Sequence, residues 1–317
     1  MKALVTGAAG FIGSHLSGVL AARGFDVVGV DCFTDYYGRE QKEANLATLA
    51  NARRFQFVEA ALQTVDLGAL LDGVTHIFHL AAQAGVRRSW GADFSVYTSH
   101  NIEATQRLLE AVRSRAIARF VYASSSSVYG DLPAIPMREE AALHPVSPYG
   151  VTKLAAEHLC YLYFVNYGVP TVSLRYFTVY GPRQRPDMAF NRFLRAALTG
   201  QPIAIYGDGE QTRDFTFVAD AAEATATAGD RGRPGAVYNI GGGSRVTLNS
   251  VLDRLARITG RSLDIRREDP QKGDMRDTFA DTTRAREDLD FRPTYTLDAG
   301  LSAEYEWMVE TLKGSRR

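Results

Sequence analysis

The chain has 317 residues, 45% of them hydrophobic and 23% charged, which is ordinary for a globular protein and long enough for one large α/β domain with a smaller partner. Its 36 basic and 36 acidic residues cancel, so bulk charge argues against a nucleic acid or an anionic membrane as a partner. No apolar run approaches the length of a membrane span, which argues against an integral membrane protein.

The first predicted elements are a strand, a glycine-rich turn and a helix. The strand Lys2–Thr6 leads into Gly7-Ala8-Ala9-Gly10-Phe11-Ile12-Gly13, and the helix that follows should end near Arg23. Glycines in such a turn permit a tight bend and a close approach of the backbone to a pyrophosphate, which the helix N-terminus attracts. A plain glycine turn is the competing interpretation. If the turn binds a dinucleotide, the contacting residues are Gly7, Gly10, Phe11, Ile12 and Gly13.

The second strand, residues 26–30, decides between these interpretations. It ends at Asp31, which lies 18 residues after Gly13. A carboxylate at this position can bind both hydroxyls of the adenosine ribose and repel a 2′-phosphate. The sequence therefore predicts a dinucleotide site and favours NAD over NADP.

Strands and helices continue to alternate as far as residue 178. We expect further strands at residues 54–59, 75–80, 119–123 and 171–176, with a long helical stretch around 96–113. This alternation predicts an α/β fold with a Rossmann-type, doubly wound parallel sheet, which binds ligands at the carboxyl ends of its strands. Beyond Thr178 the pattern loosens. We expect a Rossmann domain over 1–178 and, over 179–317, mostly a smaller α/β substrate-binding lobe, with the chain crossing between lobes more than once.

Two polar stretches follow strands of the predicted sheet. Residues 124–127 are four serines at the end of a strand. Further on, Ser147 is a good N-cap and Pro148 suits the first helical position, so a helix should begin there. Tyr149 and Lys153 then lie four apart on one face of that helix. A nearby ammonium favours the phenolate, so this pair could deprotonate a hydroxyl near neutral pH, although such pairs also arise by chance on solvated helices.

The cysteines and histidines suggest neither a disulfide framework nor a metal site. Cys32 and Cys160 are the only cysteines, which suits the cytoplasm. The six histidines lack the spacing of zinc ligands. Residues 1–5 run straight into the glycine turn and leave no room for the core of a signal peptide. We therefore expect a cytoplasmic protein without a metal.

Together these residues resemble the extended short-chain dehydrogenase/reductase family, in particular its nucleotide-sugar epimerases and dehydratases. The similar stretches cover nearly the whole chain: residues 6–13, 79–82, the serine run, Tyr149 with Lys153, 175–177 and 213–215. The resemblance implies that Tyr149 is the catalytic base, and that Lys153 lowers its pKa and holds the nicotinamide ribose. It implies that Ser125, three residues before Val128, hydrogen-bonds the reacting hydroxyl, with Ser124 as the nearest alternative.

The resemblance carries further expectations about cofactor and partner. It implies cofactor contacts by Leu80, Ala81, Ala82 and Tyr176. It also implies a homodimer formed through the Tyr149 helix and the helix before the serine strand. Apolar residues beyond Lys153 would supply that face, although they could equally lie in the monomer core: Tyr161, Leu162 and Phe164.

The residues that follow Ser125 favour one outcome within the family. Dehydratases and decarboxylases of the family carry an acid just before their Val-Tyr-Gly, where this chain has Ser126 and Ser127. Serine hydroxyls do not act as strong acids at neutral pH. This favours simple epimerisation, in which C4 is oxidised, the keto sugar turns over and the hydride returns to its other face.

Three stretches, 31–37, 82–87 and 177–188, look like those of the UDP-glucuronate 4-epimerases, which interconvert UDP-glucuronate and UDP-galacturonate. A C6 carboxylate needs hydroxyl donors or a guanidinium, and Ser126, Thr178 and Arg185 are candidates. Thr178 stands where UDP-glucose/galactose epimerases usually have asparagine. Arg185 could instead contact the diphosphate or be an ordinary surface arginine. The resemblance also places Arg213 at the diphosphate, Asp274 near the nucleotide ribose, and Arg87 and Tyr206 in the substrate site.

The sequence departs from the family pattern at two places, and two other functions are compatible with it. Ala60-Ala61-Leu62 replaces an aspartate that often contacts adenine, and Arg183-Gln184 replaces the usual Trp-Gly of the uronate epimerases. A UDP-glucose or UDP-N-acetylglucosamine 4-epimerase is the nearest rival. A non-catalytic NAD-binding regulator of the same fold is the other, and the presence of Ser125, Tyr149 and Lys153 weighs against it.

Overall fold

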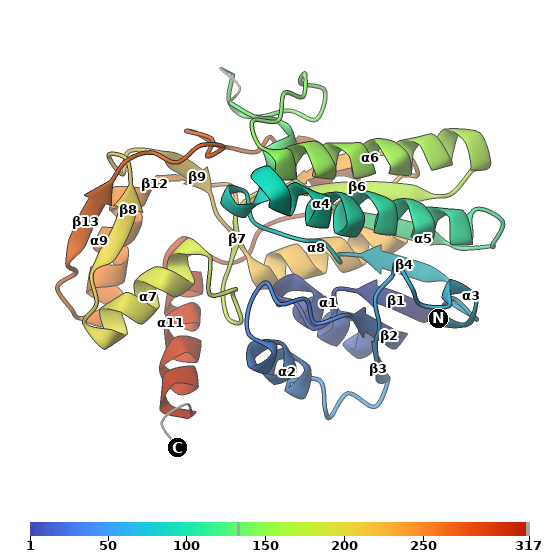
Figure 1. Cartoon of the computed structure of the whole chain (residues 1–317), viewed down its shortest axis with the longest axis horizontal. Helices are drawn as coiled ribbons and strands as arrows, with labels where there is room; N and C mark the ends of the chain where they lie inside the picture. The colour runs from blue at the N-terminus through green and yellow to red at the C-terminus, as the bar shows by residue number, and fades with distance from the viewer. Residues whose placement is uncertain (132–133, 315–317) are drawn as a thin grey trace.

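The computed structural model describes residues 1–131 and 134–314. Its centre is a seven-stranded sheet in the order β11-β6-β5-β4-β1-β2-β3 (Figure 1), and all neighbouring strands are parallel. The alternation of strands and helices predicted this doubly wound architecture, and the structure confirms it. The strands are β1 (Lys2–Thr6), β2 (Asp26–Asp31), β3 (Phe55–Glu59), β4 (His76–His79), β5 (Arg119–Ser125), β6 (Thr171–Tyr176) and β11 (Val237–Ile240).

Helices cover both faces of the sheet, and the side chains of β1 show how. Ala3 and Val5 belong to the hydrophobic core on one face, whereas Leu4 belongs to the core on the other, because successive strand residues point to opposite sides. The first core includes α1 (Phe11–Ala22) and α8 (Val218–Arg231), and the second includes α5 (Ala104–Val112) and α6 (Pro148–Tyr167). Burial on both faces explains why these strands are nearly continuous apolar runs.

The strand order reverses between β1 and β4, because the chain leaves β3 on one side of β1 and returns to β4 on the other. In open parallel sheets, ligands bind in the crevice at the carboxyl ends of the strands at such a point. The glycine turn after β1 and the segment after β4 therefore flank the natural binding crevice.

Helix α6 begins as its sequence predicts, and a glycine ends it. The Ser147 hydroxyl accepts a hydrogen bond from the Gly150 amide at 3.1 Å, Pro148 occupies the first turn, and Gly168 ends the helix with a φ of 69°. The helical stretch expected around 96–113 is divided instead. It consists of α4 (Phe94–Tyr97), a π-helical turn (Thr98–Glu103) and α5. The wider π turn directs His100 toward the ligand crevice.

The chain beyond Thr178 contains more regular helices and strands than the sequence pattern predicted. Helix α8 has 14 residues and packs against α1, and β11 joins the central sheet beside β6. Periodicity misses α8 because this alanine-rich helix is buried nearly all round, so it shows little apolar-to-polar contrast.

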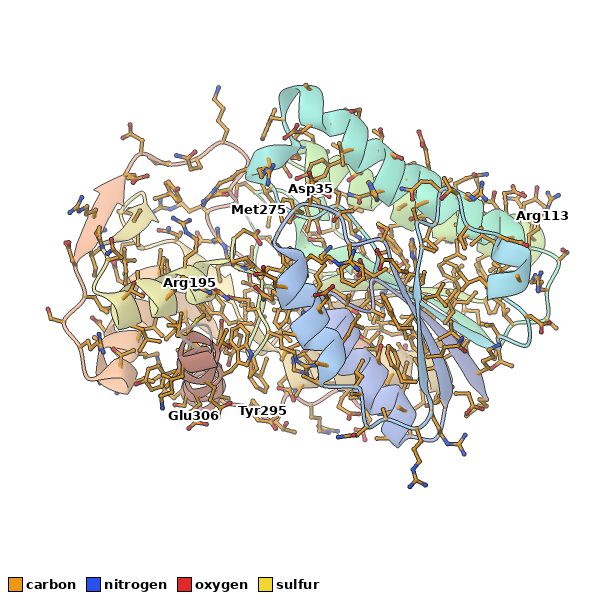
Figure 2. The ribbon with its side chains drawn as sticks, turned by 60° about the horizontal axis from the view of Figure 1, so that its bottom comes forward. Asp35, Arg113, Arg195, Met275, Tyr295 and Glu306 are labelled. Carbon is orange, nitrogen blue, oxygen red and sulfur yellow. The ribbon has the colours of Figure 1, made fainter. Side chains whose placement is uncertain are left out.

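The remaining elements lie mostly at one end of the sheet layer, where Figure 2 labels Arg195 and Glu306, opposite the end that carries Arg113. The described part of the chain contains no helix that is both long and apolar enough to cross a membrane. The other helices are α2 (Arg39–Ala47), α3 (Leu67–Leu70), α7 (Ala189–Thr199), α9 (Leu248–Thr259), α10 (Thr283–Leu289) and α11 (Leu297–Gly314). The other strands form the pairs β7 (Val179–Tyr180) with β10 (Thr216–Phe217), β8 (Ile203–Tyr206) with β13 (Ile265–Glu268), and β9 (Thr212–Asp214) with β12 (Arg245–Thr247).

Candidate active site

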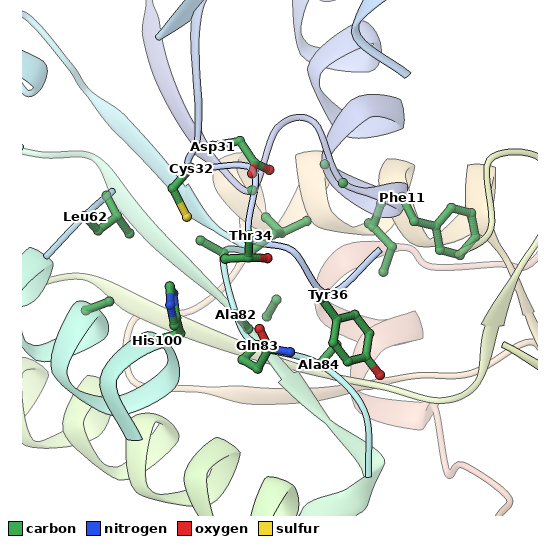
Figure 3. Close-up of a pocket in the computed structure, with 18 of the residues that line it drawn as sticks. Phe11, Asp31, Cys32, Thr34, Tyr36, Leu62, Ala82, Gln83, Ala84 and His100 are labelled. Atoms are coloured by element: carbon green, nitrogen blue, oxygen red, sulfur yellow. The ribbon is translucent and has the colours of Figure 1, made fainter. Parts of the chain in front are cut away.

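A cleft of about 1140 Å³, part of it open to solvent, lies at the carboxyl ends of the central strands. Figure 3 shows the loop after β2 on one side of it and the segment after β4 on the other. The cleft is lined by all the residues that the sequence indicated for a cofactor: Gly7, Gly10, Phe11, Ile12, Gly13, Asp31, Leu80, Ala81, Ala82, Tyr149, Lys153 and Tyr176.

The glycine turn is packed too tightly for side chains. A Cβ on Gly13 would lie 2.1 Å from the Gly7 carbonyl oxygen, and one on Gly7, whose φ is +73°, would lie 2.9 Å from the Ala81 amide. No side chain caps the N-terminus of α1. The first amides of a 12-residue helix therefore face the cleft without a side-chain partner, which is the arrangement that holds a pyrophosphate.

The adenosine end of the cleft contains a lysine that no motif indicated. Asp31 accepts a hydrogen bond from the Phe33 amide at 2.9 Å, and the Lys42 ammonium lies 3.8 Å from the same carboxylate oxygen. Lys42 is buried and donates to the Thr34 carbonyl at 3.1 Å. Ala60 and Leu62 line this end, so the departure from the usual acid gives an apolar wall beside the adenine position.

The sequence did not single out several other residues that line the cleft. Tyr36, Tyr37 and Gln83 belong to stretches that resemble the uronate epimerases, and this was the only signal for them. Cys32 and Thr34 lie in the same 31–37 stretch, whereas His100 had no signal of its own, because the π turn brings it to the cleft.

Tyr149 lines the cleft and Ser125 lies beside Tyr149 without lining the cleft itself; of the serine run, Ser124 lines it. The Ser125 side chain hydrogen-bonds the Tyr149 hydroxyl. Burial raises the pKa of Tyr149, whereas the charge of Arg185 and the bond to Ser125 lower it. These two groups therefore favour the phenolate that proton abstraction requires. Ser125 also accepts from the Ser127 amide at 3.1 Å, which fixes the turn after β5.

Lys153 also lines the cleft, with its ammonium 4.6 Å from the centre of the Tyr122 ring. Burial lowers its pKa to about 7, and the neighbouring Cys160 and Glu157 oppose this shift. The ring face offers a cation only weak compensation for lost water. The charged form of Lys153 would therefore be stabilised by additional hydrogen-bond acceptors, such as ribose hydroxyls.

The family model of the NAD-dependent epimerases and dehydratases matches residues 3–241. The chain belongs to this family. An uncharacterized UDP-glucose epimerase of Bacillus subtilis, YtcB, is 45% identical over 99% of this chain and 100% of its own length. A UDP-glucuronate 4-epimerase of Thermodesulfobacterium geofontis is 36% identical over 98% of this chain and 97% of its own. The crystal structure of a UDP-glucuronic acid 4-epimerase from Bacillus cereus, in complex with UDP-glucuronic acid and NAD, has a TM-score of 0.96 at 43% identity, over 98% of this chain and 100% of that one.

In this epimerase/dehydratase chain, a second cluster collects residues predicted to contact the nucleotide sugar. Arg87 pairs with Asp274, with Nη2 2.6 Å from Oδ2, and its guanidinium lies 4.1 Å from the centre of the Tyr206 ring. The charge of Asp274 also acts on Arg213, which donates to the Arg276 carbonyl at 2.9 Å. Loops from both parts of the chain therefore meet here.

The three candidates for carboxylate recognition are placed differently. Arg185 lines the cleft and acts electrostatically on Tyr149. Ser126 is buried in the turn after β5, and Thr178 directly precedes β7. Neither of these two residues lines the cleft in this structure.

Proposed function

We propose that the protein is an NAD-dependent UDP-glucuronate 4-epimerase that interconverts UDP-glucuronate and UDP-galacturonate. The observation that carries this proposal is the position of Arg185 in the cleft that Tyr149 and the dinucleotide turn also line, with Ser125 as the hydrogen-bond partner of Tyr149. A guanidinium beside the catalytic base suits a sugar whose C6 is a carboxylate. The likeness to the Bacillus cereus enzyme supports the same substrate.

The chain's own residues supply binding and proton transfer. Ser125 would bind the C4 hydroxyl and Tyr149 would accept its proton, while Asp31, Lys153 and the turn after β1 hold NAD. NAD held there would supply reversible hydride transfer at C4, which inverts that carbon when the hydride returns to its opposite face. The turn after Ser125 presents only serines, so it offers no acid for an elimination.

The remaining predicted contacts would hold the nucleotide while the hexose turns over. Arg213 would bind the diphosphate and Asp274 would lie near the nucleotide ribose, with Arg87 and Tyr206 beside them in the substrate site. Arg185 would bind the C6 carboxylate, with Ser126 and Thr178 as hydroxyl donors. We propose that residues 1–178 mainly bind NAD and that 179–317 mainly bind the nucleotide sugar.

A UDP-glucose or UDP-N-acetylglucosamine 4-epimerase remains the rival, and the similarity to YtcB favours testing UDP-glucose. Epimerisation assays with UDP-glucuronate, UDP-glucose and UDP-N-acetylglucosamine side by side, followed by chromatography of the products, separate these functions. We expect the highest kcat/KM with UDP-glucuronate. Faster conversion of a neutral sugar would favour the rival. Tight NAD binding without any conversion would favour a regulator.

An epimerase regenerates its oxidised cofactor in every cycle. We therefore expect NAD to co-purify with the protein and turnover to need no added NAD. Absorbance at the NADH maximum during steady turnover checks this. Stoichiometric accumulation of NADH would indicate a dehydrogenase instead.

We further propose a cytoplasmic homodimer formed through α6 and α5. Helix α6 exposes Tyr161 by 57%, Leu162 by 50% and Val165 by 58%, a row of apolar side chains that a second copy would cover. Phe164 instead packs within the subunit against Gly235, so closely that a Cβ on that glycine would lie 2.3 Å from the ring. Light scattering at micromolar concentration checks the dimer, and a monomer would contradict it.

A further inference from the structure

An ion pair at the edge of the cleft joins loops that are far apart in the sequence. Arg185 binds Asp187 in a bidentate manner, with Nε 2.9 Å from Oδ1 and Nη2 3.0 Å from Oδ2. The Tyr36 hydroxyl donates to Oδ2 of Asp187 at 3.1 Å, across 151 positions of sequence. Tyr36 follows β2 and the ion pair follows β7, so the contact ties one loop to the other. Figure 3 shows Tyr36 at the edge of the cleft, beside Ala84.

The backbone after β4 fixes the position of the Tyr36 ring. A Cβ on Gly85, whose φ is +100°, would lie 2.0 Å from the Tyr36 hydroxyl oxygen, so only glycine leaves room for this phenol. Tyr97 donates to the Ala84 and Gly85 carbonyls at 2.8 and 2.7 Å and holds that turn in place. The Tyr36 hydroxyl therefore reaches Asp187 from a fixed direction.

The ion pair uses only one edge of the guanidinium. Asp187 takes the edge formed by Nε and Nη2, and Nη1 stays outside the pair. Arg185 lines the cleft with its side chain 22% exposed. A planar guanidinium held in this way keeps a second pair of N–H groups for another carboxylate. Because the pair itself is neutral, its preference for an acid would come from directed hydrogen bonds.

We propose that Tyr36 and Asp187 are positioning residues, which hold Arg185 so that its remaining edge selects a C6 carboxylate over a neutral C6 hydroxymethyl group. The proposal rests on the proposed function and names what orients the group that recognises the uronic acid. It also explains why residues 31–37, 82–87 and 177–188 occur together. They supply Tyr36, Gly85 and the ion pair, respectively.

Dissociation constants for UDP-glucuronate, UDP-glucose and UDP test the proposal by calorimetry on the NAD-loaded protein. Every protein carries Tyr149→Phe, so that no turnover changes the ligand. Tyr36→Phe keeps the ring and should weaken UDP-glucuronate binding about fivefold, the value of one hydrogen bond. Asp187→Asn should weaken it about tenfold or more. Binding of UDP-glucose and UDP should stay within twofold in both variants.

Asp290→Asn is the matched control, because Asp290 pairs with Arg292 at the same two-residue spacing on an exposed surface. It should leave all three constants unchanged. Equal weakening of all three ligands by Tyr36→Phe would show a merely structural role, and unchanged UDP-glucuronate binding would show no role; either result overturns the proposal. If Asp187→Asn does not fold, Tyr36→Phe decides alone.

The parent protein separates this inference from the proposed function. A parent that binds UDP-glucose as tightly as UDP-glucuronate would contradict the proposed uronate substrate itself. A parent that prefers UDP-glucuronate, with variants that keep the whole preference, would contradict only the positioning role of Tyr36 and Asp187.

Discussion

The Ser124 hydroxyl donates a hydrogen bond of 2.6 Å to Oε2 of Glu157, and this bond distinguishes Ser124 from its neighbour Ser125. Glu157 lies four residues beyond Lys153 in α6 and also binds the Arg175 guanidinium. The proton of Ser124 is thus committed to a buried ion pair. The Ser125 side chain instead reaches the Tyr149 hydroxyl.

Replacing each serine by alanine should therefore affect different properties. Ser125→Ala should lower kcat about tenfold, because one hydrogen bond to the reacting groups is lost and Ser126 or water replaces it only in part. Ser124→Ala should lower kcat less, but should reduce the free energy of unfolding by about 1–2 kcal/mol, because Glu157 loses a donor. Steady-state kinetics and urea unfolding of both variants check this. The reverse pattern would identify Ser124 as the catalytic serine.

Removing one partner of the buried Glu157–Arg175 ion pair should cost far more stability than breaking an exposed pair. Nη2 of Arg175 lies 2.5 Å from Oε1 of Glu157, and both residues are at most 5% exposed. Glu157→Gln leaves a buried guanidinium without its counter-charge, which costs about 3 kcal/mol or more of unfolding free energy. Glu59→Gln, which breaks an exposed pair with Arg39, should change it far less. Similar small losses in urea unfolding of both variants would contradict this.

The pKa of Lys153 predicts how stability depends on pH in the NAD-free protein. Below pH 7 the folded and unfolded chains both carry the cation, and its burial destabilises the fold in full. Above a pKa of about 7 the folded chain releases the proton, whereas the unfolded chain keeps it up to about 10.5. The unfolded state then binds more protons, so stability rises with pH.

Lys153→Met removes this dependence and serves as the reference. From pH 7 to pH 9 the unfolding free energy of the parent should rise relative to the variant by up to about 1.4 kcal/mol per pH unit. Urea unfolding at several pH values, after NAD has been stripped, measures the difference. A constant difference across this range would show that Lys153 stays protonated in the fold.

Asp31 and Lys42 together should set the choice of cofactor. Asp31→Ala should weaken NAD binding about tenfold or more, because the ribose hydroxyls lose a charged acceptor. The same change leaves the buried Lys42 ammonium without the carboxylate that lies 3.8 Å away, so NADP should gain relative to NAD. Adding Lys42→Met should remove that gain.

Calorimetry with both dinucleotides on stripped protein measures these effects. Asp35→Ala, at an exposed position of the same loop, is the control and should change neither constant. Unchanged NAD binding in Asp31→Ala would place the adenosine ribose elsewhere.

Local sequence was enough to predict the parts of the site that lie within a few residues of one another. The glycine turn, the carboxylate at the end of β2 and the Tyr149–Lys153 spacing each sit inside one element or one turn. Their backbone geometry follows from residue type. For the same reason the bounds of β1 and β6 agree with the strands expected from the apolar runs.

The parts that escaped prediction depend on contacts between distant segments. Lys42 of α2 reaches Asp31 at the end of β2, and no spacing rule encodes that contact. Tyr36 meets Asp187 only when the loops after β2 and β7 converge. The π turn of residues 98–103 sits inside an otherwise regular helical pattern, and tertiary contacts set it. Asn101 in this turn binds the backbone of Gln83 through both ends of its amide.

The base itself gives the most direct test. Tyr149→Phe keeps the ring and its packing and removes only the ionisable oxygen, so the fold and NAD binding should survive. General base catalysis typically contributes about 10²–10⁴-fold to the rate, so kcat should fall at least about 10²-fold. Circular dichroism and NAD content verify the variant before its kinetics are measured. Substitution of Lys153 is less informative, because it changes a buried charge and a ribose contact together. If Tyr149 merely packs at the start of α6, the substitution should be nearly silent. A folded, NAD-loaded variant that epimerises within threefold of the parent would exclude Tyr149 as the base.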